Sequence, residues 1–332
     1  MKNANPQSAI RNPQSRPLPL VIVNPASASG ETGEKWPGIA SALRTHFGAF
    51  SCAFTEKSGD GQVIAARVAR AGRRFIIACG GDGTISEVAN GILETGEDVE
   101  LGVLPSGTGG DFRRTLRIPA RAGDAALALR RGVTRIMDVG RVMYINNEGV
   151  TAARFFVNVA SFGMGGAVVE RVKEKSVPWL PANTSKLLGG TGTFAVAALH
   201  TALTFTKPIV ALQLDDKPEF HLQVVNLCVA NAQYFGGGMC IAPKAKINDG
   251  QLDVVAVGNL SALSILANSY RLYLGTHLGM RQVHHACGTR LTARPEANGA
   301  EAVRLEVDGE LLGRLPATFE VVPGALRVRA PA

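Results

Sequence analysis

Two glycine-rich segments have the residue types that hold a phosphate group. Gly80–Thr84 reads Gly-Gly-Asp-Gly-Thr, and Pro105–Phe112 combines Gly-Thr with further glycines and an aspartate. Each follows an apolar run and precedes a helix-like segment. Glycines allow close approach of backbone N–H groups to an anion, and a helix N-terminus adds free N–H groups and a positive dipole end. The two segments therefore predict one phosphate-binding cleft.

The aspartates within these segments need a separate reason, because a carboxylate repels phosphate. Asp82 and Asp111 would be explained by a Mg²⁺ ion or a water network beside a nucleotide. The alternative is that Gly80–Thr84 is a tight strand–helix turn in which the aspartate caps the helix. A third segment, Asn24–Gly30, ends the first apolar run, and we expect it to line the same cleft.

Acidic residues recur near the C-terminus, in Asp308-Gly309-Glu310. We expect a turn after the run Val303–Val307 to present both acids outward. A carboxylate there could accept the proton of an attacking hydroxyl group. The competing interpretation is a hairpin turn with a solvated charge, since Asp-Gly is a common turn pair.

The five cysteines are widely scattered and form no CxxC pair, so neither a disulfide framework nor a zinc ribbon is predicted. A reducing cytoplasm is the natural compartment for such a chain. His284, His285 and Cys287 form the one ligand-like cluster of the sequence. A polar turn explains that cluster as well as a metal site does, and we predict no metal there.

Alternating strands and helices must position the first loops. Apolar runs of strand length alternate with segments of helical period, which predicts a parallel sheet covered by helices on both faces. The expected strands are Leu20–Val23, Phe50–Phe54, Phe75–Cys79 and Leu101–Leu104. The expected helices contain Trp36–Phe47, Gln62–Ala71 and Ile85–Leu93.

Short β-like runs dominate after about residue 135 and predict a mostly antiparallel sandwich. The runs are Phe155–Val159, Ile209–Leu214, Leu222–Ala230, Leu252–Val257, Leu291–Ala293, Val303–Val307, Ala317–Val322 and Leu326–Val328. Two helical stretches, Gly192–Phe205 and Leu260–Leu274, interrupt them. We expect a disordered leader over 1–17, an α/β domain over 18–135 and a β-sandwich-like domain over 136–332, with the last strand returning to the first domain.

Composition excludes wholesale disorder, because 46% of the 332 residues are hydrophobic and 19% are charged. The net charge of 35 − 27 = +8 suits phosphate-rich partners. Arginine is concentrated between Arg113 and Arg141, but no aromatic residue is interleaved with it. A nucleic-acid partner is therefore not predicted. No apolar run reaches the length of a membrane span.

The motifs resemble the diacylglycerol kinase catalytic-domain family, which includes bacterial diacylglycerol kinases, related lipid kinases and sphingosine kinases. The resemblance is carried, in the family's order, by Asn24–Ser27, Gly80–Thr84, Pro105–Phe112, Lys246–Leu252 and Asp308–Glu310. The Gly-Gly-Asp-Gly-Thr motif alone is shared with NAD kinases. The Asn-Pro-x-Ser opening and the late Asp-Gly-Glu favour the lipid branch.

The resemblance implies a two-domain lipid kinase that uses ATP and Mg²⁺ to phosphorylate the hydroxyl group of diacylglycerol or a related lipid such as a sphingoid base. It implies a role in phospholipid biosynthesis, a cytoplasmic location at the inner face of the membrane, peripheral contact with that membrane, and a chain that could form a homodimer. The two alternatives are an NAD kinase-like or other small-molecule kinase, and a weakened protein that only binds nucleotide or lipid.

Site residues follow from the same resemblance. Glu310 would be the general base, with Asp308 as a supporting acid, while Asp82 and Asp111 would order Mg²⁺ and water. A structural Mg²⁺ would be held by the Asp249 side chain and the carbonyl groups of Lys246 and Gln251. The implied nucleotide contacts are Asn24, Pro25, Ser27, Gly30, Thr55, Gly80, Gly81, Asp82, Gly83, Thr84, Ile85, Ser86, Gly107 and Thr108.

Two positions depart from the family's pattern. Gly110 stands where the family has an asparagine before the aspartate of the second loop, and Ala28 stands where it has a glycine. The missing amide predicts weaker catalysis more than weaker nucleotide binding. For the lipid chains, we expect contacts from Ala195–Phe205 and from Trp179, with the ordinary core of the second domain as the alternative for both.

Overall fold

The computed structural model describes residues 18–168, 201, 203–296 and 303–332. Its N-terminal part contains a parallel sheet with the strand order β2-β1-β3-β4. The strands of this sheet are β1 (Leu20–Val23), β2 (Ser51–Phe54), β3 (Phe75–Gly80) and β4 (Glu100–Pro105). β1, β3 and β4 are almost wholly buried, as expected for central strands of a sheet that is covered on both faces.

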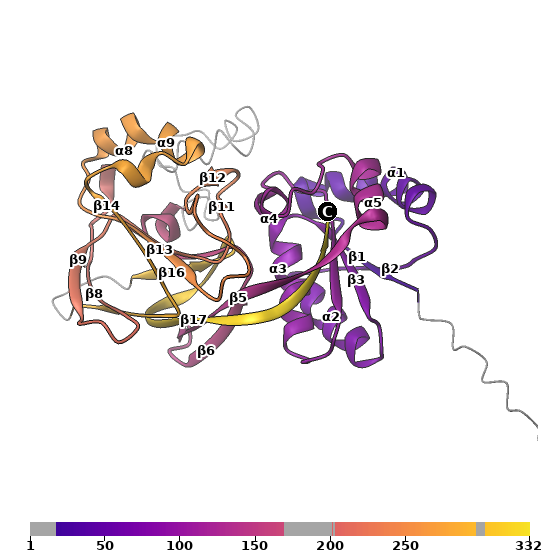
Figure 1. Ribbon diagram of the computed structural model, residues 1–332, viewed down its shortest axis with the longest axis horizontal. Coiled ribbons are helices and arrows are strands. Elements are labelled where there is room, and N and C mark those ends of the chain that lie inside the picture. Colours follow the sequence, from indigo (N-terminus) through magenta and orange to yellow (C-terminus); the bar gives the residue numbers. More distant parts are fainter. Residues whose placement is uncertain (1–17, 169–200, 202, 297–302) are drawn as a thin grey trace, which may run out of the picture.

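Helices cover both faces of this sheet. Figure 1 shows α1 and α5 together on one side of the strands, and α2 and α3 on the other. The predicted three-layer arrangement is therefore confirmed. The helical segments are the 3-10 turn η1 (Ser27–Gly30), α1 (Glu31–His46), α2 (Asp60–Arg70), α3 (Asp82–Leu93), α4 (Asp111–Thr115) and α5 (Ala122–Arg131).

The β-rich half is antiparallel, as predicted, and forms two layers. One layer has the order β14-β13-β10-β7-β16, and the other contains β9, β8, β15, β17, β5 and β6. The Phe162 and Phe319 rings stack between the layers at a centroid distance of 6.2 Å. The short strands are β6 (Thr151–Phe156), β7 (Val159–Gly163), β8 (Ile209–Leu214), β9 (Phe220–Gln223), β10 (Asn226–Ala230), β11 (Tyr234–Phe235), β12 (Met239–Cys240), β13 (Leu252–Val257), β14 (Val283–Gly288), β15 (Arg290–Pro295) and β16 (Arg304–Val307).

Two long strands, β5 (Val133–Asn146) and β17 (Glu310–Ala330), connect the halves. They pair antiparallel over most of their length, and the end of β17 pairs in parallel with β4 through Val328 and Leu101. Figure 1 shows β17 passing from the β-rich half into the α/β half. The sheet is thus continuous through the molecule. The expected domain boundary at 135/136 lies within β5, and the division of the chain there stays a prediction.

Several predicted segments differ in detail from the structure. The run Phe155–Val159 spans the end of β6 and the start of β7, and Leu222–Ala230 is divided between β9 and β10. The stretch Leu260–Leu274 contains two short helices, α8 (Ala262–Asn268) and α9 (Tyr270–Leu274), which are followed by the 3-10 turn η2 (His277–Gly279). The predicted leader, Trp179 and most of Gly192–Phe205 lie outside the described residues.

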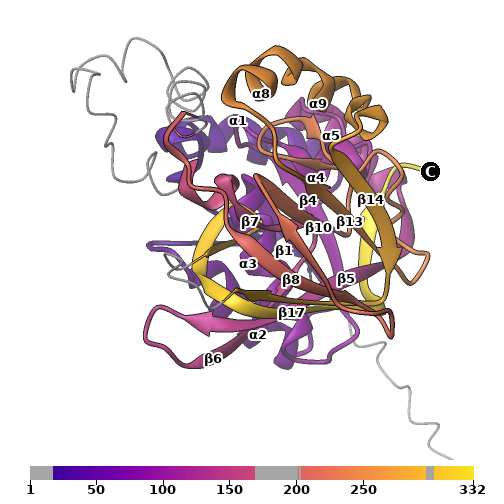
Figure 2. The same ribbon diagram turned by 90° about the vertical axis from the view of Figure 1, so that its left-hand side faces the viewer.

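Figure 2 shows α8 and α9 above the strands of the β-rich half, on the side away from β6 and α2. Figure 1 gives the same arrangement from a second direction. Among the described residues, no helix has both the length and the apolar character that crossing a membrane would require.

Candidate active site

Hydrogen bonds join the loops that follow β1, β3 and β4. The Asn24 backbone N–H donates to the Cys79 carbonyl at 3.0 Å, and Asn24 Nδ2 donates to Thr84 Oγ1 at 3.1 Å. On the other side, the Ser106 N–H donates to the Gly80 carbonyl at 2.9 Å. The three loops that the sequence placed at one edge of the sheet are therefore held together there.

Two of these loops approach each other closely at glycines. A Cβ atom built on Gly107 would lie 2.4 Å from the Gly81 Cα atom, and one built on Gly109 would lie 2.6 Å from Asp82 Oδ2. A side chain at position 107 would displace the backbone of the other loop, and one at position 109 would displace the Asp82 carboxylate. Glycine is thus needed at both positions for the two loops to contact each other. This reason is separate from any approach of a ligand to the backbone.

A pocket of about 380 Å³ opens beside the joined loops. Such a volume is in the range of small-molecule sites. Seven predicted site residues line it: Asn24, Ser27, Thr55, Gly81, Gly83, Thr84 and Glu310. The other lining residues are Ala26, Glu56, Lys57, Ser58 and Glu87. One pocket therefore brings the glycine loop of α3 and the acid at the start of β17 together.

Asp82 fixes the second glycine loop through both of its carboxylate oxygens. Asp82 Oδ2 accepts hydrogen bonds from the N–H groups of Gly110 at 2.7 Å and Asp111 at 3.2 Å. Its Oδ1 accepts one from the Phe112 N–H at 3.0 Å. The carboxylate therefore caps α4 from another loop, which is a positioning role that the sequence did not reveal.

Asp111 connects the second glycine loop to the β-rich half. Its Oδ2 accepts a hydrogen bond from the Gly237 N–H at 2.8 Å, and Arg114 Nη1 donates to its Oδ1 at 3.2 Å. Burial raises the pKa of the Asp111 carboxyl above its usual range, while the Gly237 hydrogen bond acts in the opposite direction. The contact ties α4 to the turn between β11 and β12.

The Asp308-Gly309 pair forms the two-residue turn of the β16–β17 hairpin. Both residues have positive φ, 48° and 88°, and Val307 pairs with Glu310. The Glu310 side chain is 30% exposed, and its Oε2 lies 3.6 Å from Arg154 Nη2. Asp308 and Gly309 therefore form a hairpin turn, as the competing interpretation had it, and Glu310, which follows this turn, lines the pocket.

Asp308 does not point outward, contrary to our expectation. Its carboxylate is buried and accepts hydrogen bonds from the N–H groups of Val157, Asn158 and Val159 at 3.0–3.1 Å. The Ser86 side chain is a further partner. Burial raises the pKa of the Asp308 carboxyl to about 6. Asp308 thus holds the β6–β7 turn against α3, which supports the site without facing the pocket.

The remaining predicted nucleotide contacts are near the pocket but do not line it. Ile85 and Ser86 are buried on α3, whereas Thr108 is exposed on the second loop. Pro25 packs under α1, since a Cβ atom on Gly33 would lie 3.2 Å from the Pro25 Cβ atom. Gly30 adopts a φ of 97° as the N-cap residue of α1, and the Gly80 backbone contacts Thr84.

The predicted Mg²⁺ ligands occupy one exposed turn before β13. Lys246, Asp249 and Gln251 are all exposed, and Asp249 Oδ1 accepts a hydrogen bond from the Gln251 N–H at 3.2 Å. The Gly250 N–H donates to the buried carboxylate of Asp138 at 2.7 Å, which fixes the turn to β5. A carboxylate and two backbone carbonyl groups on one turn form an oxygen donor set that suits a hard cation.

Comparison with known proteins decides the family. Residues 19–142 match the diacylglycerol kinase catalytic domain, and residues 176–330 match the YegS C-terminal NAD kinase beta sandwich-like domain. A Pseudomonas aeruginosa protein (strain PAO1) named "Probable lipid kinase YegS-like" is 32% identical over 284 residues, which cover 84% of this chain and 83% of that protein. The chain belongs to the diacylglycerol kinase catalytic-domain family.

Other members of the family agree with this result, and the chain is accordingly an enzyme of the lipid kinase class. The diacylglycerol kinase of Bacillus subtilis (strain 168) is 27% identical over 80% of both chains. The crystal structure of a diacylglycerol kinase from Bacillus anthracis str. Sterne superposes with a TM-score of 0.68 at 21% identity, and covers 94% of this chain and 96% of that one. At this identity the superposition shows a shared fold.

The two departures from the lipid kinase pattern occur at left-handed backbone positions. Gly110 has φ 68° and ψ 36°, a conformation that asparagine adopts more readily than other non-glycine residues. Ala28 has φ 53°, where the family's glycine would be unstrained. A left-handed alanine costs roughly 1–2 kcal/mol. The first departure thus removes an amide at a backbone position that asparagine can adopt, and the second introduces strain.

Three residues at or beside the pocket belong to no recognisable sequence motif and were not predicted. The buried Glu87 carboxylate accepts hydrogen bonds from the N–H groups of Gly59 at 2.8 Å and Gly61 at 2.9 Å, which anchors the loop before α2. Lys57, the one cation among the lining residues, lies on that loop. Arg154 reaches Glu310 from β6. Glu87 and Arg154 act through partners distant in the chain, so no local pattern could mark them.

Proposed function

We propose that the protein transfers the γ-phosphoryl group of ATP, with Mg²⁺, to a hydroxyl group of diacylglycerol or a related lipid such as a sphingoid base. One observation carries the proposal. A Cβ atom on Gly83 would lie 3.9 Å from Glu310 Oε1. A candidate base therefore lies directly beside a candidate phosphate-binding loop, and both line the same pocket.

In the proposed reaction, the chain's own groups bind and orient the phosphates. The backbone of Gly81 and Gly83 and the Thr84 hydroxyl line the pocket, and Lys57 adds a positive charge. Together they supply positioning for phosphoryl transfer. Because Lys57 is outnumbered by the lining acids Glu56, Glu87 and Glu310, most of the charge neutralisation would come from Mg²⁺. ATP with Mg²⁺ supplies the activated phosphoryl group when bound. Asp82 contributes by holding the second loop, since its carboxylate oxygens accept three backbone hydrogen bonds.

Glu310 accepts the proton of the lipid hydroxyl group while the oxygen of that hydroxyl group attacks the γ-phosphorus atom of ATP. The bond from the γ-phosphorus to the bridging oxygen breaks, and the products are a lipid phosphate and ADP. Arg154, 3.6 Å from Glu310 Oε2, orients the carboxylate. The oxygen ligands on the turn of Lys246, Asp249 and Gln251 would hold a second, structural Mg²⁺ away from the reacting atoms.

Incubation with ATP, Mg²⁺ and a total lipid extract, read by mass spectrometry, tests this function. We expect one lipid class to gain a phosphate, and omission of Mg²⁺ should abolish the product. Formation of NADP from NAD would support the NAD kinase-like alternative instead. Tight ATP binding without transfer to any acceptor would indicate a protein that only binds nucleotide.

We further propose that α8 and α9 contact the membrane that carries the lipid. Their large apolar side chains are 49–78% exposed and recur at helical spacing. A membrane surface is the natural cover for such a row in a lipid kinase. Sequence reasoning assigned these residues only to a helix. The row consists of Leu263, Leu266, Tyr270, Tyr273 and Leu274.

Co-sedimentation with vesicles of phosphatidylglycerol and phosphatidylethanolamine tests the membrane contact. The double variant Leu263→Gln/Leu274→Gln should reduce the bound fraction several-fold. Val150→Gln is the matched control, because Val150 is also an exposed apolar residue (60%) but lies on the β5–β6 turn. Equal binding by both variants and the parent protein would reject α8 and α9 as the docking surface.

A further inference from the structure

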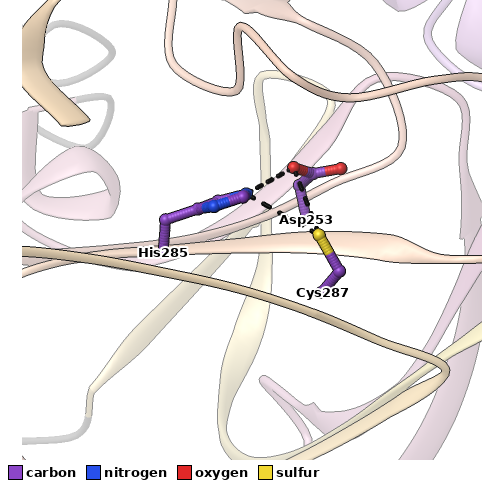
Figure 3. A group of neighbouring side chains, drawn as sticks. All are labelled: Asp253, His285 and Cys287. Carbon is purple, nitrogen blue, oxygen red and sulfur yellow. Dashed lines mark hydrogen bonds and ion pairs between the residues drawn. The ribbon is translucent and has the colours of Figure 1, made fainter.

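Three chemically different side chains converge on one face of the β13–β14 pair. Asp253 lies on β13, and His285 and Cys287 lie two residues apart on β14, with Asp253 opposite Cys287 in the register. Figure 3 shows the imidazole and the thiol both directed at the Asp253 carboxylate. His285 Nε2 is 2.6 Å from Asp253 Oδ1, and Cys287 Sγ is 3.7 Å from the same oxygen and 3.8 Å from His285 Nε2.

These separations are close to those of ligands around one metal ion. Bonds of about 2.0–2.3 Å at tetrahedral angles place neighbouring ligand atoms roughly 3.3–3.6 Å apart. Both distances from the sulfur atom are near this range. The nitrogen–oxygen distance is that of a hydrogen bond, so an ion would separate the imidazole and the carboxylate by a fraction of an ångström. Small side-chain rotations on neighbouring strands accomplish this.

The chemical types of the three ligands indicate which class of metal ion would bind. Imidazole and thiolate ligands suit a borderline or soft transition metal, whereas Mg²⁺ prefers oxygen ligands only. The Asp253 side chain is 5% exposed and the His285 side chain 18%, so their surroundings restrict the movement of both. Cys287 is exposed, which leaves a route for an ion to enter.

We propose that Asp253, His285 and Cys287 form a binding site for a transition-metal cation of the Zn²⁺ class. The three side chains supply three ligands, and water occupies the fourth position. On binding, the Cys287 thiol loses its proton to solvent and sulfur bonds to the metal, while the hydrogen bond between His285 and Asp253 is replaced by two metal bonds. The ion then fastens β14 to β13. The site is independent of the proposed kinase reaction.

This site is distinct from the oxygen-only turn, although the two are neighbours. Asp249 of that turn and Lys244 act electrostatically on the Cys287 thiol. Asp253, His285 and Cys287 supply the nitrogen and sulfur ligands, while Lys246, Asp249 and Gln251 supply oxygens alone. Excess Mg²⁺, which prefers oxygen ligands only, should therefore not displace the bound zinc.

The full-length protein, stripped with a chelator and reloaded with Zn²⁺ or Co²⁺, tests the proposal. We expect one zinc ion per chain by elemental analysis and, with Co²⁺, a thiolate-to-metal charge-transfer band. Cys287→Ser should abolish the band, and His285→Ala should weaken zinc binding at least tenfold. The matched controls are His284→Ala, whose side chain projects from the opposite face of β14, and Cys52→Ser, on β2; both should bind as the parent does.

Thermal unfolding gives a second readout in case a variant folds poorly. Zinc should raise the unfolding temperature of the parent protein and of His284→Ala, and leave that of a folded Cys287→Ser variant unchanged. The proposal is overturned if the stripped parent retains no zinc after reloading. It is equally overturned if the charge-transfer band persists in Cys287→Ser, or if His284→Ala weakens binding as much as His285→Ala does.

Discussion

For Glu310, the sequence left two interpretations open: a general base, or a solvated charge that follows a hairpin turn. Glu310 follows an Asp-Gly hairpin turn, and yet it lines the pocket beside Gly83. Glu310→Gln preserves the shape of the side chain and removes its ability to accept a proton. We expect the rate of phosphoryl transfer to fall by at least about 10²-fold. The affinity for ATP, measured by titration calorimetry, should change little, because the nucleotide contacts that we propose come from the loops of the α/β half.

A charge-matched control separates this effect from a change in net charge. Glu148→Gln alters an exposed acid on the β5–β6 turn and should leave the rate unchanged. Retention of more than about a tenth of the rate in Glu310→Gln would reject Glu310 as the base. Asp308 is a poor substitute, since its buried carboxylate accepts three backbone hydrogen bonds.

Gly110 tests whether the missing amide weakens this enzyme. Its left-handed backbone suits asparagine, and the atom nearest to an added Cβ is Arg113 Nε at 2.7 Å, near the end of a flexible side chain. We therefore expect Gly110→Asn to fold with nearly parental stability in urea and to raise turnover. Gly110→Ala is the control, which should lose roughly 1–2 kcal/mol of stability without any gain in rate. If the Gly110→Asn variant is stable and its turnover is unchanged, the missing amide does not weaken catalysis in this enzyme.

At the scale of elements, the contact between the two glycine loops should be the most sensitive point of the α/β half. A Cβ atom on Gly107 would lie 2.4 Å from the backbone of Gly81, so Gly107→Ala must push the loops apart. We expect at least tenfold weaker ATP binding and a lower unfolding temperature. Gly38→Ala is the matched control, because a Cβ atom on Gly38 meets nothing within 4 Å and alanine favours the helix there. Equal ATP affinity in the two variants would contradict this account.

Some strands and loops could be predicted from the local sequence, and others could not. The bounds of β1, β8 and β13 agree with the predicted runs, because these short strands are mostly apolar, with one polar residue each in β8 and β13. β5 was not predicted, since its exposure follows no simple period and its partner β17 comes far later in the chain. The glycine loops carry a local signal. The roles of Asp82 and Arg154 depend on partners distant in sequence, so no local pattern could reveal them.

At the scale of the whole molecule, two buried acids lie on the hairpin that begins β17. Glu306 Oε2 accepts a hydrogen bond from Ser161 Oγ at 2.6 Å, and its Oε1 accepts one from the Gly309 N–H at 2.5 Å. Burial raises the pKa of Glu306 to about 7, and the nearby Asp308 acts in the same direction. Because β17 pairs with strands of both halves, the ionisation of Glu306 should affect the stability of the entire fold.

The pH dependence of unfolding tests this coupling. A folded pKa above the unfolded value means that the folded state retains the proton longer, so this contribution to stability is complete below about pH 4.5 and is lost as the pH rises through about 7. We expect the parent protein to lose about 1–3 kcal/mol from this group between pH 5 and pH 8. Glu306→Gln should flatten that loss in urea titrations, because its amide cannot ionise. The amide oxygen can still accept from the Gly309 N–H, and the amide NH₂ group can donate to Ser161 Oγ. Parallel pH profiles for the two proteins would contradict a raised pKa at Glu306.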